Sequence, residues 1–215
     1  MIPNLIVPTL KRYDLLQRMI TSIDYPVEHL LIIDNGNLID QLKLPEMVKE
    51  MTVLTMPANL GVSSSWNLGV KCFPFAPVWF IASDDVEFLP GTLEAWSEMS
   101  NPDSMIVSDD EPFFQFFSVG ENVVNRVGLF DEAIHPANFE DNEYEWRCNQ
   151  LGFNIERVNL PHNHTKQGTV HDRKYVDANH RTYAINQIYF EHKISQNILT
   201  AGEWSLDRRR ANSWD

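Results

Sequence analysis

The sequence predicts an α/β fold with a mostly parallel central sheet flanked by helices, because short apolar segments alternate with segments of helical periodicity. The apolar segments 5–7, 30–33 and 78–82 each end at a proline or at polar residues, as buried strands do. Between the first two, apolar side chains recur at helical spacing over residues 15–23. Strands joined by helices in this order form parallel, layered sheets.

The rest of the first half adds another buried strand and a second helix. Residues 53–54, closed by Pro57, form the strand. The helix runs through Trp66 and Val70, and residues 63–65 are serines that are candidates for its N-cap. In such sheets ligands collect at the carboxyl ends of the strands. The polar residues at these ends are Thr9, Asp34, Asn59, Ser83, Asp84 and Asp85.

The second half predicts less regular elements. They are a strand over 113–117, a helix over 141–150, a strand near 155–158 and a helix over 177–193. In the first strand, alternation places Phe114 and Phe116 on the face opposite to Phe113 and Phe117. Residues after Ser195 are mostly polar, which predicts a poorly ordered tail or a docking arm.

Composition limits the classes of function. The chain has 215 residues, of which 43% are hydrophobic, enough for one sizeable core. Its formal net charge of -13 would repel a phosphate backbone, so we expect no nucleic-acid partner. Cys72 and Cys148 lack metal-ligand spacing and predict neither a disulfide nor a zinc site, as in a reduced, cytoplasmic protein. We also expect no signal peptide and no transmembrane segment, since no apolar run is long enough.

An acidic cluster directly follows the strand at 78–82. Adjacent carboxylates such as those of Asp84 and Asp85 repel one another unless they share a cation, and a divalent ion with oxygen ligands is the usual solution. A diphosphate would complete the shell of such an ion. Alternatively, one of the two aspartates caps the helix that begins near residues 90–92.

A second acidic pair and two histidines lie further along the chain. Glu140 and Asp141 stand at the start of a predicted helix, where the helix dipole favours negative charge and ordinary capping explains them. His162 and His164 follow the strand near 155–158, where they either bind a metal, form structural hydrogen bonds or lie solvated on a loop. The residues alone leave these alternatives open.

The segment 80–91, Phe-Ile-Ala-Ser-Asp-Asp-Val-Glu-Phe-Leu-Pro-Gly, resembles the aspartate motif of family 2 glycosyltransferases. Further segments within residues 3–170 resemble motifs of that family in the same order. They are 8–12 (the opening nucleotide loop), 34–36 (the base-contacting turn), 59–63 with 67–69 (the helix-opening segment), and 127–132 with 139–141 (the pair before the acceptor-side helix). The resemblance implies a GT-A fold and an inverting glycosyltransferase similar to compact bacterial or phage-encoded members.

The resemblance also implies roles for single residues. Asp141 is similar to the general base that takes a proton from the acceptor hydroxyl, with Glu140 as the alternative. Asp85 and His164, the latter preferred over His162, would hold Mn²⁺ or Mg²⁺. The residues expected to bind the nucleotide-sugar are Pro8, Thr9, Arg12, Asp34, Asn35, Asn59, Gly61, Asn67, Asp84 and Lys166.

The chain departs from the family pattern at two positions. Trp66 stands where the family commonly has a basic residue, so a contact to phosphate or base is absent there. Ser83 stands where an aspartate is common, which leaves open how many carboxylates reach the cation.

These features predict one GT-A domain over 1–193, with a nucleotide-sugar-binding half (1–107) and an acceptor-side half (108–193), followed by a C-terminal tail over 194–215. We expect a metal-dependent inverting glycosyltransferase that uses a UDP-, GDP- or dTDP-sugar and a hydroxyl of a glycan, lipid head group or protein. One alternative is a nucleotidyltransferase that forms nucleotide-sugars, although its glycine-rich loop is not visible at 8–12. The other is a non-catalytic module that binds a nucleotide or a sugar.

Overall fold

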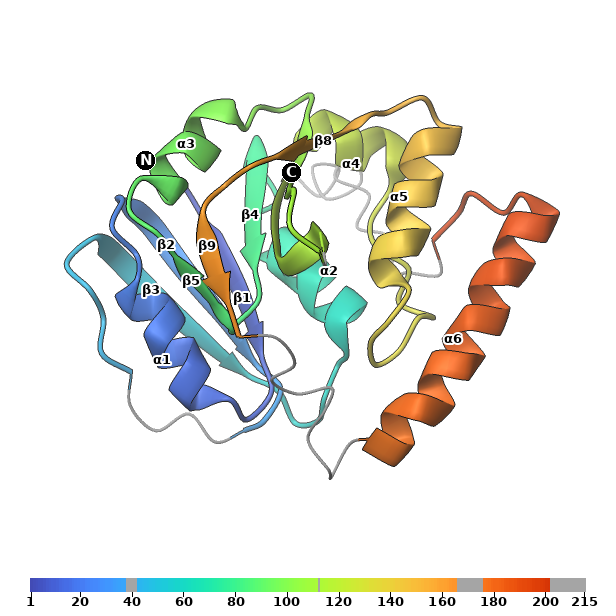
Figure 1. Cartoon of the computed structure of the whole chain (residues 1–215), viewed down its shortest axis with the longest axis horizontal. Coiled ribbons are helices and arrows are strands. Elements are labelled where there is room, and N and C mark those ends of the chain that lie inside the picture. The colour runs from blue at the N-terminus through green and yellow to red at the C-terminus, as the bar shows by residue number, and fades with distance from the viewer. Residues whose placement is uncertain (38–41, 112, 166–175, 202–215) are drawn as a thin grey trace, which may run out of the picture.

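A seven-stranded sheet forms the centre of the computed structural model, and helices cover both of its faces (Figure 1). The structure describes residues 1–37, 42–111, 113–165 and 176–201. Its first half contains β1 (Leu5–Thr9), α1 (Tyr13–Thr21), β2 (Val27–Asp34), β3 (Val48–Thr55), α2 (Val62–Cys72), β4 (Val78–Ala82), β5 (Val86–Phe88) and α3 (Thr92–Met99). Its second half contains β6 (Met105–Ser108), η1 (Phe113–Gln115), β7 (Phe116–Gly120), α4 (Glu121–Val127), α5 (Glu140–Gln150), β8 (Ile155–Val158), β9 (His162–His164) and α6 (Val176–Gln196).

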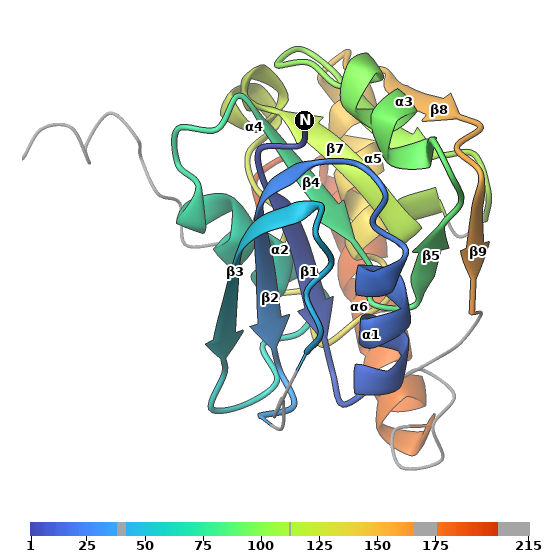
Figure 2. The ribbon, with the colours of Figure 1, turned by 90° about the vertical axis from the view of Figure 1, so that its left-hand side faces the viewer.

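The sheet has the strand order β3-β2-β1-β4-β7-β6-β8. β7 runs antiparallel to both of its neighbours, and the other neighbouring strands pair in parallel. The mostly parallel sheet predicted from the sequence is therefore confirmed. The carboxyl ends of β1, β2 and β3 meet at one edge of the sheet (Figure 2). A separate antiparallel pair, β5 and β9, brings residues 86–88 to residues 162–164.

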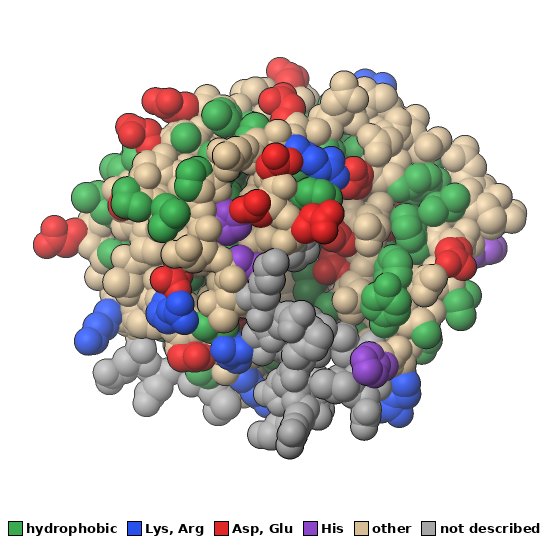
Figure 3. Space-filling view, viewed as in Figure 1, with side chains coloured by type: hydrophobic (Ala, Val, Ile, Leu, Met, Phe, Trp, Pro, Cys, Tyr) green, Lys and Arg blue, Asp and Glu red, His purple; other side chains and the backbone are tan. Residues whose placement is uncertain are grey.

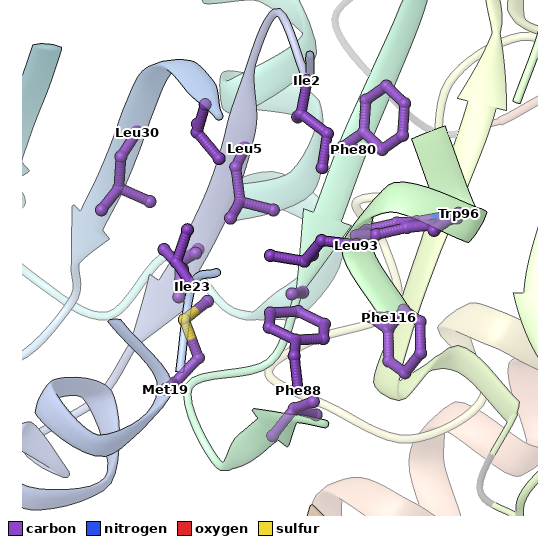
Figure 4. Close-up of a cluster of buried hydrophobic side chains, with 14 of the residues drawn as sticks. Ile2, Leu5, Met19, Ile23, Leu30, Phe80, Phe88, Leu93, Trp96 and Phe116 are labelled. Atoms are coloured by element: carbon purple, nitrogen blue, oxygen red, sulfur yellow. The ribbon is translucent and has the colours of Figure 1, made fainter. Parts of the chain in front are cut away.

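Alternating side chains along the strands fill one core on each face of the sheet. Leu5, Leu30 and Phe80 share the first core with Met19 of α1 and Trp96 of α3 (Figure 4). The adjoining residues on the same strands enter the second core, which contains Ile6, Leu31, Ile81, Trp66, Val123 and Tyr144. Helices α1 and α3 thus cover one face, and α2, α4 and α5 cover the other.

The predicted strand at 113–117 was wrong in its position. Residues 113–115 form a 3₁₀ turn, and the strand begins at Phe116. β4 ends at Ala82, which pairs with Phe116, and beyond it the backbone N–H of Ser83 donates to the oxygen of Gln115 at 2.7 Å as the chain enters the turn. Consequently Phe114 and Phe117 share the second core, while Phe116 enters the first.

Two smaller predictions also require correction. Residues 53–54 belong to β3, which lies at the edge of the sheet and is partly exposed instead of buried. The serines before Trp66 do not cap α2, because the residue at its N-cap is Gly61. Ser63 and Ser65 are instead buried within the helix.

A buried network of charged side chains joins α6 to α5. Lys193 of α6 contacts the carboxylates of Asp131 and Glu143, and its Nζ donates to the backbone oxygen of Thr200 at 2.9 Å. Arg147 forms a two-point ion pair with Glu143 at 2.7 and 2.9 Å. All four charged side chains are fully buried. Helix α6, expected as a surface helix, therefore also carries a charge into the interior.

This network extends slightly beyond the predicted domain limit at residue 193. Helix α6 ends at Gln196, and the backbone N–H of Ile198 donates to the oxygen of Lys193 at 2.9 Å. Residues 202–215 of the predicted tail lie outside the described residues.

Replacing Lys193 by Met should lower the free energy of unfolding by about 3–5 kcal/mol, because two buried carboxylates would then share the single cation of Arg147. Urea denaturation of both proteins measures the difference. Lys49→Met is the matched control, because Lys49 pairs with Glu28 on the surface and its loss should change stability little. Equal losses in the two variants would contradict the role given to Lys193.

Candidate active site

Residues predicted to bind the donor meet at the carboxyl edge of the sheet. Thr9 at the end of β1 pairs with Asp34 at the end of β2. Thr9 Oγ1 donates to Asp84 Oδ2 at 2.5 Å, which links β1 to the segment after β4. Burial is the main cause that raises the pKa of Asp84 to about 7, with a contribution from the charge of Asp85 and against the charge of Arg12. The arrangement concentrates ionisable groups at one point of the edge.

Asp85 and His164 face each other across the paired strands β5 and β9. The backbone N–H of Thr165 donates to the oxygen of Asp85 at 3.0 Å, and Val86 pairs with His164. This register places His164 Nε2 3.3 Å from Asp85 Oδ2. Both side chains are largely buried, with 13% and 14% of their surface exposed. The two predicted metal ligands are therefore neighbours in space although 79 positions separate them in the sequence.

The Asp85–His164 pair suits a hard divalent cation. A carboxylate oxygen and an imidazole nitrogen are ligands that Mn²⁺ accepts, and Mg²⁺ also favours the carboxylate. Nε2 is the nitrogen of His164 that faces Asp85, whereas Nδ1 is buried without a hydrogen-bond partner in the described part of the chain. No group of three or more His, Cys, Asp or Glu side chains that could hold a metal exists among the described residues. A diphosphate and water would therefore have to complete the shell.

His162 has structural partners instead. Its Nε2 lies 2.8 Å from Gln115 Oε1, and its Nδ1 lies 2.8 Å from the backbone oxygen of Leu160. The ring also packs edge-on against Phe116, with 4.9 Å between the ring centroids. Of the two histidines, His164 is the one that the structure places beside Asp85.

The turn after β2 is built by its own side chains. Asp34 Oδ1 accepts hydrogen bonds from Tyr13 Oη (3.0 Å), from the backbone N–H of Gly36 (2.9 Å) and from that of Asn37 (3.1 Å). Asp34 is completely buried, so the turn holds a charged group beneath the carboxyl edge. Hydrogen bonds from three donors stabilise such a buried carboxylate.

Asn35 connects this turn to the start of α2. Its backbone N–H donates to the oxygen of Thr9 at 2.9 Å, and its Oδ1 accepts from the N–H of Leu60 at 2.9 Å. Its Nδ2 donates to Ser65 Oγ at 3.0 Å. Asn35 thus holds three elements together beneath the edge.

The segment 59–61 also contacts His135 and Pro136. Asn59 Oδ1 accepts from the N–H of Gly61 at 3.0 Å. Gly61 has φ of +79°, and a Cβ there would lie 2.7 Å from His135 Cδ2 and 2.9 Å from the oxygen of Pro136. Only glycine meets both requirements, because other residues rarely adopt this φ and would clash.

The remaining predicted donor residues lie in different surroundings. Asn67 is buried in α2, where its amide bonds the backbone of Phe130 in both directions at 2.8 and 2.9 Å. Pro8 is partly exposed on β1. Lys166 lies outside the described residues. Trp66, where the family has a basic residue, packs edge-on against Phe117 and belongs to the second core.

Glu140 and Asp141 form the first turn of α5, directly after a strained piece of backbone. Asn138 and Phe139 have φ of 75° and 78°, a conformation that residues other than glycine adopt rarely. Asp141 Oδ1 accepts from the N–H of Asn142 at 2.8 Å. Strained backbone of this kind persists only where its surroundings hold it and is frequent at functional sites.

The acids of this turn titrate in unusual ranges. Burial first and the charge of Asp141 second raise the pKa of Glu140 to about 8. Burial also raises the pKa of Asp141, with a further contribution from the charge of Glu145. Glu140 Oε2 is buried without a hydrogen-bond partner in the described part of the chain. A carboxyl group with a raised pKa next to a polar surface is a candidate for proton transfer.

One residue that the sequence analysis missed holds this turn in place. Asn186 of α6 is buried, and its Nδ2 donates to the backbone oxygens of Ala137 at 2.9 Å and Asn138 at 3.2 Å. The only signal in the sequence is an asparagine on a helix with imperfect apolar periodicity. That signal does not identify a partner almost 50 positions away.

No protein-family model matches the amino-acid sequence of the chain. A galactofuranosyl glycosyltransferase of Leishmania donovani is 22% identical, over 71% of this chain and 53% of that protein. The chain therefore spans about half the length of the curated relative it matches.

Solved structures are similar in fold. The catalytic domain of Drosophila β1,4-galactosyltransferase 7 has a TM-score of 0.54 at 15% identity, covering 79% of this chain and 72% of that one. S. aureus TarS 1–349 in complex with UDP has a TM-score of 0.54 at 14% identity, covering 70% and 56%. The chain has the GT-A fold.

The fold alone does not decide the reaction. A nucleotidyl transferase from Methanothermobacter has a TM-score of 0.53 at 11% identity, covering 86% of this chain and 99% of that one. Sugar transfer and nucleotidyl transfer must therefore be separated by residues at the site.

None of the described helices combines the length and the apolar character needed to cross a membrane.

Glu140→Gln should stabilise the protein at high pH and not at low pH. The folded-state pKa of about 8 lies above the unfolded value, so the wild type loses stability as pH rises from about 4.5 through 8, whereas the amide has no proton to lose. We expect the melting temperature of the variant, relative to the wild type, to rise between pH 5 and pH 8.5. A difference independent of pH would show that Glu140 is not buried as described.

Proposed function

We propose that the chain is a metal-dependent inverting glycosyltransferase that transfers a sugar from a nucleotide-diphospho-sugar to an acceptor hydroxyl. The observation that carries the proposal is the pair Asp85–His164 next to Thr9 and Asp84 at the carboxyl edge of a GT-A sheet. A second Drosophila β1,4-galactosyltransferase 7 structure, with a TM-score of 0.52 and 13% identity over 80% of this chain and 77% of that one, is a complex with manganese, UDP-Gal and xylobiose. That complex supports a divalent cation and a UDP-sugar for this chain.

The donor side is assigned to the ends of β1, β2 and β4. The nucleotide lies over Asp34, with Thr9 and Arg12 beside it, and Asp84 reaches the ribose. Pro8 bounds the same loop on β1, and Lys166 is assigned to the diphosphate. Other predicted donor residues support the site indirectly, because their hydrogen bonds hold the loops on which the nucleotide-sugar rests. They are Asn35, Asn59, Gly61 and Asn67.

Asp85 and His164 would hold Mn²⁺ or Mg²⁺, which neutralises the charge that develops on the diphosphate leaving group. Without such a cation, Asp84 and Asp85 would repel the diphosphate. The net charge of -13 would also repel an anionic donor, which again favours binding together with a cation.

Asp141 is assigned as the general base, with Glu140 as the alternative. It accepts the proton of the acceptor hydroxyl while the acceptor oxygen forms a bond to the anomeric carbon. The bond from that carbon to the phosphate oxygen breaks, and the nucleoside diphosphate leaves with the electron pair. A single displacement from the opposite face inverts the anomeric centre.

Two substitutions separate binding from turnover. Asp85→Ala should abolish manganese-dependent binding of the nucleoside diphosphate, measured by calorimetry with and without the metal. Asp141→Asn should leave that binding nearly unchanged and lower kcat by about 10²- to 10⁴-fold, the usual contribution of a general base. Glu98→Gln, an exposed carboxylate on α3, is the control for both measurements. Full activity of Asp141→Asn would show that Asp141 is not the general base and would leave Glu140 as the candidate.

The pH dependence tests the assignment of the base. Because burial and Glu145 raise the pKa of Asp141, the acid limb of kcat/KM should lie above the ordinary range of an aspartate. Glu145→Gln removes one of these causes and frees Arg157, so the limb should move to lower pH. Glu156→Gln on β8 is the control, and an unmoved limb in Glu145→Gln would count against Asp141.

The second candidate is a nucleotidyltransferase, which the Methanothermobacter neighbour favours. The products distinguish the two reactions. A glycosyltransferase releases a nucleoside diphosphate from a nucleotide-sugar, whereas a nucleotidyltransferase releases pyrophosphate from a nucleoside triphosphate and a sugar phosphate. Screening both substrate sets with manganese therefore decides between them, and binding without either product would indicate a non-catalytic module.

A further inference from the structure

We infer that the surface where α5 and α6 meet, beside Glu140 and Asp141, binds the ring of an uncharged sugar as the acceptor. This inference rests on the proposed glycosyl transfer and narrows its acceptor to a neutral glycan, as opposed to a phosphate-bearing lipid head group. Two independent features carry it, a group of aromatic rings and a pair of acids without counter-charges.

The aromatic group joins the turn before α5 to both helices. Phe139 lies 4.8 Å from Tyr183 and 6.0 Å from Phe190 between ring centroids, and Phe190 lies 6.3 Å from Trp146. Tyr183 is 46% exposed, and the other three rings are partly buried. Because Phe139 directly precedes Glu140, these rings adjoin the candidate base.

Partly exposed rings next to a candidate general base favour a sugar. The faces of aromatic rings carry negative charge, and the C–H groups on one side of a pyranose carry positive charge, so the two stack. The hydroxyl groups at the edge of the same sugar can donate hydrogen bonds to carboxylates. A purely apolar ligand would gain from the rings but would leave those carboxylates without donors.

The charges of α5 disfavour an anionic acceptor. Glu143 is neutralised by Arg147 and Lys193, and Glu145 by Arg157 at 2.8 and 2.9 Å. In contrast, the described residues supply no ion pair to Glu140 or Asp141. Because the pKa of Glu140 is about 8, Glu140 is mostly protonated at neutral pH, and a phosphate or carboxylate brought against this turn would meet the uncompensated charge of Asp141, which opposes binding. Figure 3 shows acidic side chains near the middle of this face and hydrophobic side chains over α6.

The surface is fixed before any ligand arrives. Asn186 holds the turn that carries Phe139, and Lys193 anchors the same helix to α5. A site whose rings are already in position loses little conformational entropy on binding, which favours affinity.

Binding to the full-length chain tests the inference by saturation-transfer NMR, without any need to know the donor. The probes are the methyl pyranosides of galactose, glucose and mannose, each compared with the uronide that differs only by a carboxylate. We expect the best neutral glycoside to bind at least about tenfold more tightly than its uronide. Tyr183→Ala should weaken the neutral probe about fivefold, in line with the loss of one ring contact.

Matched variants make the result specific. Ile188→Ala removes an apolar side chain that is 68% exposed on the same helix and has no part in the ring group, so it should leave binding unchanged. Asp141→Asn should narrow the difference between neutral and charged probes. Equal binding of the two probes, no binding of any neutral glycoside, or no effect of Tyr183→Ala would each overturn the inference.

Failure of the inference is distinguishable from failure of the proposed function. If the wild type releases a nucleoside diphosphate from a nucleotide-sugar but binds the uronides equally well, the sugar site is wrong and the transferase stands. If it binds the neutral glycosides through Tyr183 but no donor yields a nucleoside diphosphate, the sugar site stands and the transferase is wrong.

Discussion

Burial of four charged side chains between α5 and α6 is the constraint on which the second half of the chain depends. Two carboxylates, Asp131 and Glu143, and two cations, Arg147 and Lys193, leave water together and compensate one another. Such a group tolerates little displacement, because separating any partner exposes an uncompensated charge to a low-dielectric interior. The network therefore fixes α6 against α5, and through α6 it fixes the turn that aims Glu140 and Asp141.

Acidic side chains that are paired with cations lie in the interior, whereas acidic side chains without such partners lie at the candidate site. Asp131 and Glu143 sit in the interior with cations, whereas Asp84, Glu140 and Asp141 have raised pKa values because burial is not offset by equally strong partners. Burial of this kind destabilises the fold at neutral pH, and chains keep it where the chemistry requires it. The strained residues Asn138 and Phe139 add to the cost at the same point.

Local patterns in the sequence were sufficient for one side of the site and insufficient for the other. Thr9, Asp34 and Asp84 follow apolar strands directly, so the parallel sheet alone brings them to one edge. The choice between His162 and His164 depends on the register of β5 with β9, which no local pattern encodes. The position of β7 and the 3₁₀ turn before it depend on where β4 ends. Asn186 contacts the turn before α5, which lies almost 50 positions earlier in the sequence, and helical periodicity does not predict such a contact.

The proposed donor and acceptor sites differ in the charge of the ligand that each can accept. A diphosphate is anionic, yet the edge that would receive it presents Asp84 and Asp85, so the donor is compatible with this edge only together with a cation. No comparable cation is needed at α5, where a sugar hydroxyl donates to a carboxylate. An anionic acceptor at α5 would be repelled as a diphosphate is at the donor edge, but without a cation to offset the repulsion. In the described part of the chain, no histidine lies at metal-ligand distance from Glu140 or Asp141. In the proposed assignment, the same acidity that makes the donor side depend on a metal makes the acceptor side selective for neutral molecules.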